Sequence, residues 1–199
     1  MSPAQFADAV SGYLSPGYGL RPRTEADLPF LCDLYAHTRE EELAPVPWPQ
    51  EQKRAFLEDQ FDKQHRHYLQ HYPQAQWWIV TCEDRAVGRL YVAQTARDLR
   101  VMDVSLLAAH RNQGVGGALM RSLLAHADRL GISASLHVEP FNPALRLYQR
   151  LGFVHVETRG IYHFMERAPS VEDQFVAHAL RVPADGHHEQ LEAAVPGVV

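Results

Sequence analysis

The sequence is poor in cysteine and lysine and has no long hydrophobic run. Its two cysteines, Cys32 and Cys82, stand far apart and form no CxxC pattern, so we expect neither a disulfide framework nor a zinc site. Lysine occurs only at Lys53 and Lys63, and the formal net charge is -5, which excludes a polybasic surface for nucleic acid or anionic lipid. No apolar run approaches the ~20 residues of a membrane span, and the N-terminus lacks the features of a signal peptide. We therefore expect a cytoplasmic protein that binds neither nucleic acid nor membrane.

The remaining composition is ordinary for one globular domain. The chain has 199 residues, of which 46% are hydrophobic, so a single core is expected. Residues 168–199 carry five acids and one base, and thus four of the five net negative charges. We predict three parts: an N-terminal extension (1–17), a central domain (18–167) and a C-terminal extension (168–199). The last part is expected to hold a short helix over 170–182 and a flexible acidic tail.

Hydrophobic periodicity predicts a chain of mixed α and β structure. Apolar residues at helical spacing predict helices over 24–43, 51–70, 114–130 and 143–151. Runs rich in β-branched and aromatic residues predict strands at 20–23, 77–82, 86–93, 99–107, 134–138, 153–159 and 161–166. This order predicts an α+β fold in which helices flank a central sheet.

A glycine-rich stretch lies between the strand that ends at Leu106-Leu107 and the helix over 114–130. It reads Arg111-Asn112-Gln113-Gly114-Val115-Gly116-Gly117. Backbone N–H groups converge at such a helix start, and the helix dipole there favours a phosphate or pyrophosphate. Glycines that only ease packing are the alternative, but each glycine inside a helix costs up to ~1 kcal/mol. The patterns of a P-loop and of a dinucleotide fingerprint are absent, so a nucleoside triphosphate is not expected.

With Arg111 first, Gly114 fourth and Gly116 sixth, this stretch resembles the R/Q-x-x-G-x-G/A signature of the GNAT superfamily of acetyltransferases. Residues 142–153 (NPALRLYQRLGF) resemble the family's N-x-x-A-x-x-L-Y-x-x-x-G-F element. The resemblance covers 18–167 and implies a mixed, mostly antiparallel sheet. In that fold, a parallel strand pair, here 99–107 and 134–138, splays apart to form the acetyl-CoA cleft.

The resemblance also implies which residues hold the cofactor. The 111–117 stretch would hold the pyrophosphate of coenzyme A, and the backbone N–H groups at Leu106 and Leu107 would face the thioester carbonyl. Asn142 would contact the pantetheine arm. Asn142 could equally cap the helix that follows it, and the two roles are compatible.

Transfer of an acetyl group to an amine needs a proton donor for the departing thiolate. Tyr148 is the candidate acid, since a tyrosine with a pKa of ~10 stays protonated beside a thiol of pKa ~8.5. It matches the tyrosine of the family motif. The alternative is an ordinary core tyrosine at helical spacing.

The base that accepts the amine proton has three candidates: His137, Asp103 and Glu139. Strand alternation puts Asp103 on the same side as Ser105, and His137 on the same side as Glu139. We place His137 first, because related enzymes often carry a glutamate base at its position and an imidazole pKa of ~6.5 suits this task. A purely structural role for Asp103 and His137 is the alternative.

The acceptor is expected to bind at the first two helices and their loop, where acids and an aromatic residue gather: Glu40, Glu41, Glu42 and Trp48. These acids would suit a cationic acceptor, unless they form a solvated helix end. No catalytic metal is expected, because the histidine pairs lack a third ligand and no HExxH is present.

The sequence thus predicts an N-acetyltransferase that moves an acetyl group from acetyl-CoA directly to a primary amine, with a small-molecule acceptor preferred. The alternatives are a protein or peptide N-acetyltransferase and a noncatalytic acyl-CoA-binding regulatory module. A homodimer is left open.

Overall fold

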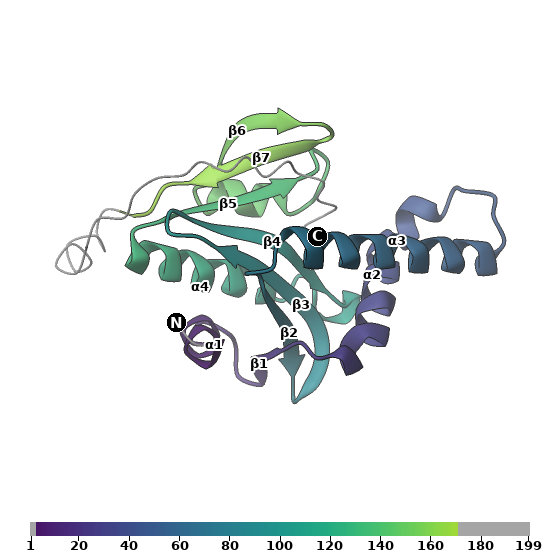
Figure 1. Ribbon diagram of the computed structural model, residues 1–199, viewed down its shortest axis with the longest axis horizontal. Helices are drawn as coiled ribbons and strands as arrows, with labels where there is room; N and C mark the ends of the chain where they lie inside the picture. The colour runs from purple at the N-terminus through teal and green to yellow at the C-terminus, as the bar shows by residue number, and fades with distance from the viewer. Residues whose placement is uncertain (1–2, 171–199) are drawn as a thin grey trace.

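The structure is a computed structural model that describes residues 3–170. Its centre is a seven-stranded sheet with the order β1-β2-β3-β4-β5-β7-β6 (Figure 1). The strands are Tyr18–Pro22 (β1), Gln76–Cys82 (β2), Arg85–Gln94 (β3), Asp98–Leu106 (β4), Ser133–Val138 (β5), Val154–Arg159 (β6) and Tyr162–Arg167 (β7). All neighbouring strands are antiparallel except β4 and β5, which run parallel. The expected mixed, mostly antiparallel sheet is confirmed.

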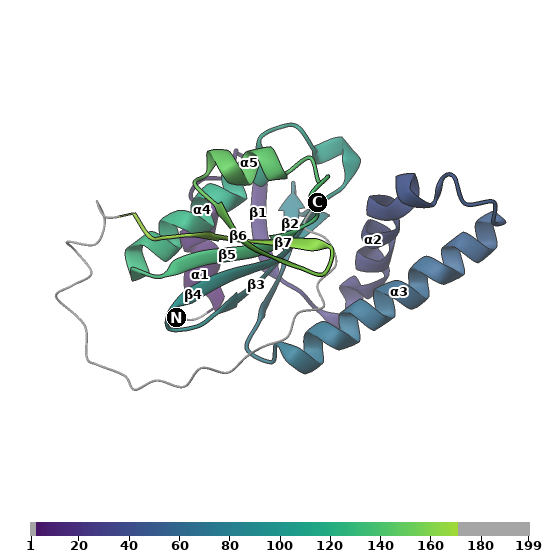
Figure 2. The ribbon, with the colours of Figure 1, turned by 90° about the horizontal axis from the view of Figure 1, so that it is seen from above.

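Helices cover both faces of this sheet. They are Pro3–Ser11 (α1), Leu28–Leu43 (α2), Gln50–His71 (α3), Val115–Leu130 (α4) and Leu145–Arg150 (α5), with 3-10 turns at Glu25–Asp27 (η1) and Ala108–His110 (η2). In both views α2 and α3 lie side by side and reach beyond the edge of the sheet (Figures 1 and 2). Among the described residues, no helix combines the length and the apolar character that crossing a membrane requires.

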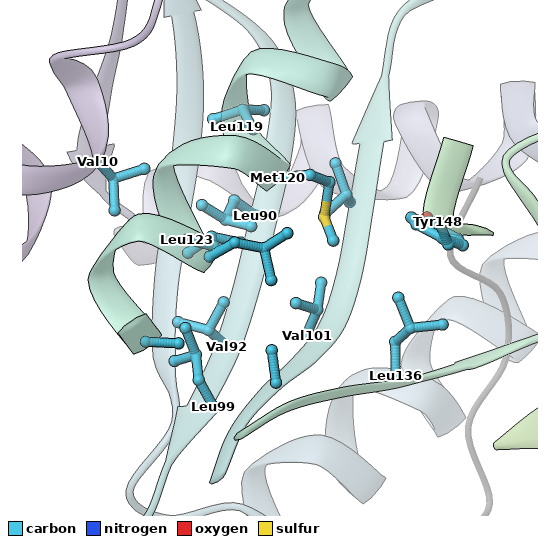
Figure 3. Close-up of a cluster of buried hydrophobic side chains, with 14 of the residues drawn as sticks. Val10, Leu90, Val92, Leu99, Val101, Leu119, Met120, Leu123, Leu136 and Tyr148 are labelled. Carbon is cyan, nitrogen blue, oxygen red and sulfur yellow. The ribbon is translucent and has the colours of Figure 1, made fainter. Parts of the chain in front are cut away.

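Two hydrophobic clusters fill the two faces, as strand alternation requires. Val80 and Val92 pack on the α4 side, while their neighbours Ile79 and Tyr91 pack against α2 and α3. Figure 3 shows the first cluster, where side chains of α4 such as Leu123 lie over β3 and β4.

The parallel pair stays together over only four residues. Asp98–Val101 of β4 pair with Ser133–Leu136 of β5, and both strands then continue without pairing with each other. Between β3 and β4 the register passes from Tyr91↔Asp103 to Val92↔Val101, so Met102 is an extra, bulged residue of β4. A bulge bends its strand and increases its local twist. The predicted splayed pair is therefore present, and we call the space between its ends the β4–β5 gap.

The N-terminal helix α1 was not predicted from the sequence. Phe6 and Val10 are fully buried, and the Phe6 ring stacks on Trp78 at 5.5 Å. A nine-residue helix is marginal by itself, so this contact with a strand far along the chain stabilises it. The segment 1–17 thus includes a helix that is part of the core.

The last helix is shorter than predicted. The Asn142 side chain accepts a hydrogen bond from the Ala144 N–H at 2.8 Å, and α5 begins only at Leu145. Pro143 and Ala144 form a turn. The helix and acidic tail predicted over 170–199 lie almost wholly outside the described residues.

Candidate active site

The glycine-rich stretch, Arg111–Gly117, leads from η2 into α4 and we call it the anion loop. Gly114 caps α4 with φ 83°, a left-handed conformation that glycine adopts most readily. The first helical hydrogen bond joins the Ala118 N–H to Gly114 O at 2.9 Å, so the preceding N–H groups lack helical acceptors. These belong to Val115, Gly116 and Gly117. A Cβ added at Gly114 or Gly116 would meet nothing within 4 Å, so the space beside the donors is open.

Arg111 adds a positive charge to this loop. Its Nε donates to Leu106 O at 2.8 Å, which fixes the guanidinium at the end of β4. Its Nη2 is buried and has no hydrogen-bond partner within residues 3–170. A buried guanidinium nitrogen with an unused donor fits a phosphate oxygen. The Gln113 side chain is occupied differently, because its Nε2 donates to Ala109 O inside the loop. Gln113 and Asn112 could therefore serve a ligand best through their backbone.

The end of β4 presents one backbone donor to the β4–β5 gap. The Leu107 N–H donates to Val87 O at 2.8 Å and is thus bound to β3. Successive N–H groups of a strand point to opposite edges, so the Leu106 N–H points toward the gap. Of the two predicted donors, Leu106 is the one in position.

Tyr148 lies in α5 on the α4 side of the gap, near Leu136 (Figure 3). Its side chain is 2% exposed and its ring meets Phe153 edge-on at 6.0 Å. Burial raises the pKa of its hydroxyl, and the negative charge of Asp103 adds to this shift. The phenol is therefore protonated at neutral pH. Tyr148 is a core residue, and it also carries a proton next to the gap.

Asp103 is fully buried on the α2–α3 side of β4. Its two carboxylate oxygens accept hydrogen bonds from Arg89 at 2.6 Å and from Ser105 at 2.7 Å. Arg89 also donates to Gln64 of α3 at 3.2 Å. Burial raises the pKa of Asp103, and the Arg89 guanidinium opposes that shift. Because both oxygens are engaged, these contacts describe a structural ion pair better than a proton acceptor.

His137 is buried at the end of β5, 3% exposed, with its ring 5.1 Å from Phe164. Burial, helped by the positive charges of Arg100 and Arg159, lowers its pKa to about 4. Its Nε2 is buried without a hydrogen-bond partner in the described part of the chain. His137 is therefore neutral at pH 7, but it is a weak base. His137 and Asp103 have separate partners and are not bonded to each other.

Glu139 directly follows β5 and differs from the other two candidates in being accessible. Its side chain is 31% exposed, and its Oε1 lies 3.9 Å from Nη1 of Arg39 in α2. Arg39 is held in turn by Glu42, which accepts from it through both carboxylate oxygens, and it lies over the Tyr35 ring. Glu139 thus stands between the gap and α2.

A cavity of about 500 Å³ lies between α2 and α3. Its lining is Tyr35, Arg39, Glu42, Leu43, Phe56, Leu57, Gln60, Lys63, Gln64 and His67. Of the predicted acceptor residues, Glu42 reaches this cavity but is neutralised by Arg39. Glu40 lines a second cavity of about 470 Å³ instead. Trp48, in the loop between α2 and α3, packs edge-on against Phe56 of α3. Glu41 lines neither cavity. In the first cavity Glu42 faces two cations, Arg39 and Lys63, so this cavity does not carry the negative charge predicted for a cationic acceptor.

Two arginines that the sequence did not single out, Arg39 and Arg89, form ion pairs with residues of other elements, Glu139 and Asp103. A signal existed for Arg89, because a hairpin of the predicted strands would place it across from Ser105, as the register shows. Within residues 3–170, no three His, Cys, Asp or Glu side chains are grouped so as to hold a metal ion.

A sequence model of the acetyltransferase (GNAT) family matches residues 31–153, which is more than half of the chain. The match includes the anion loop and Tyr148. No curated protein matches the chain in a sequence search.

Solved structures share the fold. The PaiA N-acetyltransferase of Thermoplasma acidophilum in complex with coenzyme A has a TM-score of 0.59 at 16% identity, over 76% of this chain and 98% of its own. RimL, a ribosomal L7/L12 alpha-N-protein acetyltransferase in complex with coenzyme A, has a TM-score of 0.56 at 17% identity, over 78% and 96%. A GNAT acetyltransferase from Elizabethkingia anophelis with acetyl-CoA bound has a TM-score of 0.52 at 14% identity, over 77% and 99%. The resemblance stated from the two motifs is thus confirmed: the chain belongs to the acetyltransferase (GNAT) family.

Proposed function

We propose that this protein is an N-acetyltransferase that moves an acetyl group from acetyl-CoA directly to a primary amine. The observation that carries the proposal is the anion loop beside the β4–β5 gap. There, uncapped N–H groups, open space at Gly114 and Gly116, and the buried Nη2 of Arg111 occur together.

These residues fit a coenzyme A pyrophosphate. The N–H groups of Val115, Gly116 and Gly117 would bind its oxygens at the positive end of the α4 dipole, and Arg111 would add a charged donor. The unpaired edges of β4 and β5 offer backbone groups to the amides of the pantetheine arm. Bound acetyl-CoA supplies the activated acetyl thioester.

The chain's own groups supply the remaining chemistry. The Leu106 N–H donates to the carbonyl oxygen as negative charge develops there. The Tyr148 hydroxyl gives its proton to the departing sulfur. Glu139 accepts the amine proton, since it is the accessible carboxylate at the end of β5, whereas His137 is too weakly basic. We therefore place Glu139 before His137 as the base, which reverses the preference drawn from the sequence.

Direct transfer without an acyl-enzyme is supported by the state of the cysteines. Burial raises the pKa of the Cys32 thiol in α2, so little nucleophilic thiolate forms. Cys82 ends β2 beside Tyr18 of the edge strand β1, and β3 separates it from β4. Neither thiol lies on β4, β5 or α5, the elements around the gap.

A small-molecule amine is the acceptor we favour. The cavity between α2 and α3 has a volume typical of small-molecule sites, and Arg39 connects it to Glu139. A protein acceptor is the alternative, and the RimL neighbour acts on a protein according to its description.

The test uses Gly116→Leu, because the space there is open and the backbone is unstrained, so the variant should fold. Wild type should bind acetyl-CoA in calorimetry, show a raised melting temperature with it, and release coenzyme A with at least one member of a panel of small amines and peptides. Gly116→Leu should lose the binding, whereas Gly12→Leu, an exposed glycine outside the site, should keep it. Unchanged binding in Gly116→Leu would place the anion site elsewhere. Tight binding without turnover on any amine would favour a noncatalytic module.

A further inference from the structure

The anion loop is held by a residue that lies outside the span matched by the family model. Tyr18, the first residue of β1, places its hydroxyl 2.8 Å from Nδ1 of His110 in η2. The two rings also meet edge-on, with centroids 5.8 Å apart. The same hydroxyl lies 3.5 Å from Oε1 of Gln113, inside the loop. Tyr18 thus contacts the chain on both sides of Arg111, at His110 before the loop and at Gln113 within it.

The polar side chains of the loop are otherwise held from β4 and η2. Arg111 Nε donates to Leu106 O, and Gln113 Nε2 donates to Ala109 O. The backbone of the loop includes two left-handed residues, Asn112 at φ 57° and Gly114 at φ 83°. A chain with such turns needs fixed neighbours to keep its N–H groups aimed at one point.

Tyr18 is itself fixed in place. It pairs with Cys82 of β2, its N–H donates to Ser15 O, and it packs against the main hydrophobic cluster. On its other side, Gly17 O accepts a hydrogen bond from the Glu83 N–H. Tyr18 is therefore a fixed strand residue that anchors the loop, although its partner His110 lies 92 residues further along the sequence.

We propose that Tyr18 is a positioning residue for phosphate binding, which holds His110 and Gln113 so that the N–H groups in the first turn of α4 converge on the coenzyme A pyrophosphate. This inference rests on the proposed function, because the phosphates belong to the cofactor named there. It makes the N-terminal strand a part of the cofactor site, although Tyr18 itself need not touch the cofactor.

The test compares ligands with and without phosphates in Tyr18→Phe. The variant keeps the ring and loses only the hydrogen bonds, so the Kd for coenzyme A in calorimetry and the KM for acetyl-CoA should rise about three- to tenfold. The kcat should stay within about twofold. With S-acetylpantetheine, which lacks the pyrophosphate, kcat/KM should equal that of wild type. Tyr13→Phe, at a tyrosine that is 53% exposed, should change nothing.

A double-variant cycle identifies the partner. If Tyr18 acts through His110, then His110→Ala should weaken coenzyme A binding, and the double variant should be no weaker than the worse single variant. An unchanged Kd in Tyr18→Phe, or equal losses with acetyl-CoA and S-acetylpantetheine, would overturn the inference while the proposed function stands. Wild type that binds neither ligand would overturn both.

Discussion

The two sides of the β4–β5 gap differ in the groups that they offer to a ligand: backbone N–H groups on one side and charged side chains on the other. On the side of α4, the groups suited to a ligand are mainly backbone: the N–H groups of the anion loop and of Leu106, with Arg111 as a charged addition. On the side of α2 and α3, charged side chains stand in pairs, one of them buried and the others at the surface. Those pairs include Arg89–Asp103, Arg39–Glu42, Arg54–Glu58 and Lys63–Asp59.

The difference has a consequence for recognition. Backbone donors bind a phosphate whatever the neighbouring side chains are, so the donor side is tied to one kind of ligand. Substitution of one member of a side-chain pair alters the local charge, so the acceptor side can change its ligand while the fold is kept. We therefore expect charge-altering substitutions to act mainly on the acceptor side.

The largest effect is expected at the buried pair Arg89–Asp103. Arg89→Met leaves the Asp103 carboxylate buried without its cation, which should lower the free energy of unfolding by about 3–5 kcal/mol. Arg54→Gln, in an exposed pair, should cost less than about 1 kcal/mol. Urea unfolding measures both. The double variant Arg89→Met/Asp103→Leu should recover part of the loss, and a loss as small as that of Arg54→Gln would show that the pair is unimportant for stability.

On the donor side, the side chain that should matter most for turnover is Tyr148. Tyr148→Phe removes the proton donor, so kcat should fall by about 10²-fold, while the Kd of coenzyme A stays within about twofold. Steady-state kinetics and calorimetry measure the two quantities. Tyr72→Phe, another buried tyrosine far from the gap, is the control. Wild-type turnover in Tyr148→Phe would reduce this residue to its packing role against Phe153.

The same contrast explains what could be predicted from the sequence. Local patterns mark three features. Closely spaced glycines at a helix start mark the anion loop, hydrophobic periods mark the strands along the chain, and the 142–153 motif marks Tyr148. The splayed strand pair followed from the family resemblance, and its four-residue pairing confirms it.

What was missed depends on contacts between distant segments. Helix α1 forms against Trp78, and the Tyr18–His110 bond joins residues of two separate elements. The choice of base shows the same limit, since strand alternation predicted only that Asp103 shares a side with Ser105 and His137 with Glu139. Only the surroundings decide how basic each one is: burial and two arginines at His137, and burial opposed by Arg89 at Asp103.

A smaller effect is expected from Glu139 on the acceptor side. Glu139→Gln keeps the shape but cannot take a proton, so kcat/KM for the amine should fall about tenfold, and the KM for acetyl-CoA should not change. Glu157→Gln, an exposed glutamate on β6, is the matched control. Equal rates for Glu139→Gln and wild type would mean that water takes the amine proton.

The smallest effect is expected from His137, and it should show as a dependence of stability on pH. The pKa of His137 is about 4 in the folded protein and ~6.5 when unfolded, so between these values the unfolded chain binds more protons. The stabilisation is complete above about pH 6.5 and is lost as the pH falls toward about 4. Between about pH 7.5 and 5.5, wild type should lose about 1 kcal/mol more of its unfolding free energy than His137→Gln does. The other histidines contribute equally to both proteins, so the difference between their urea midpoints across this range isolates His137. Parallel curves would show that burial and the positive charges of Arg100 and Arg159 do not lower the pKa of His137 in the folded protein.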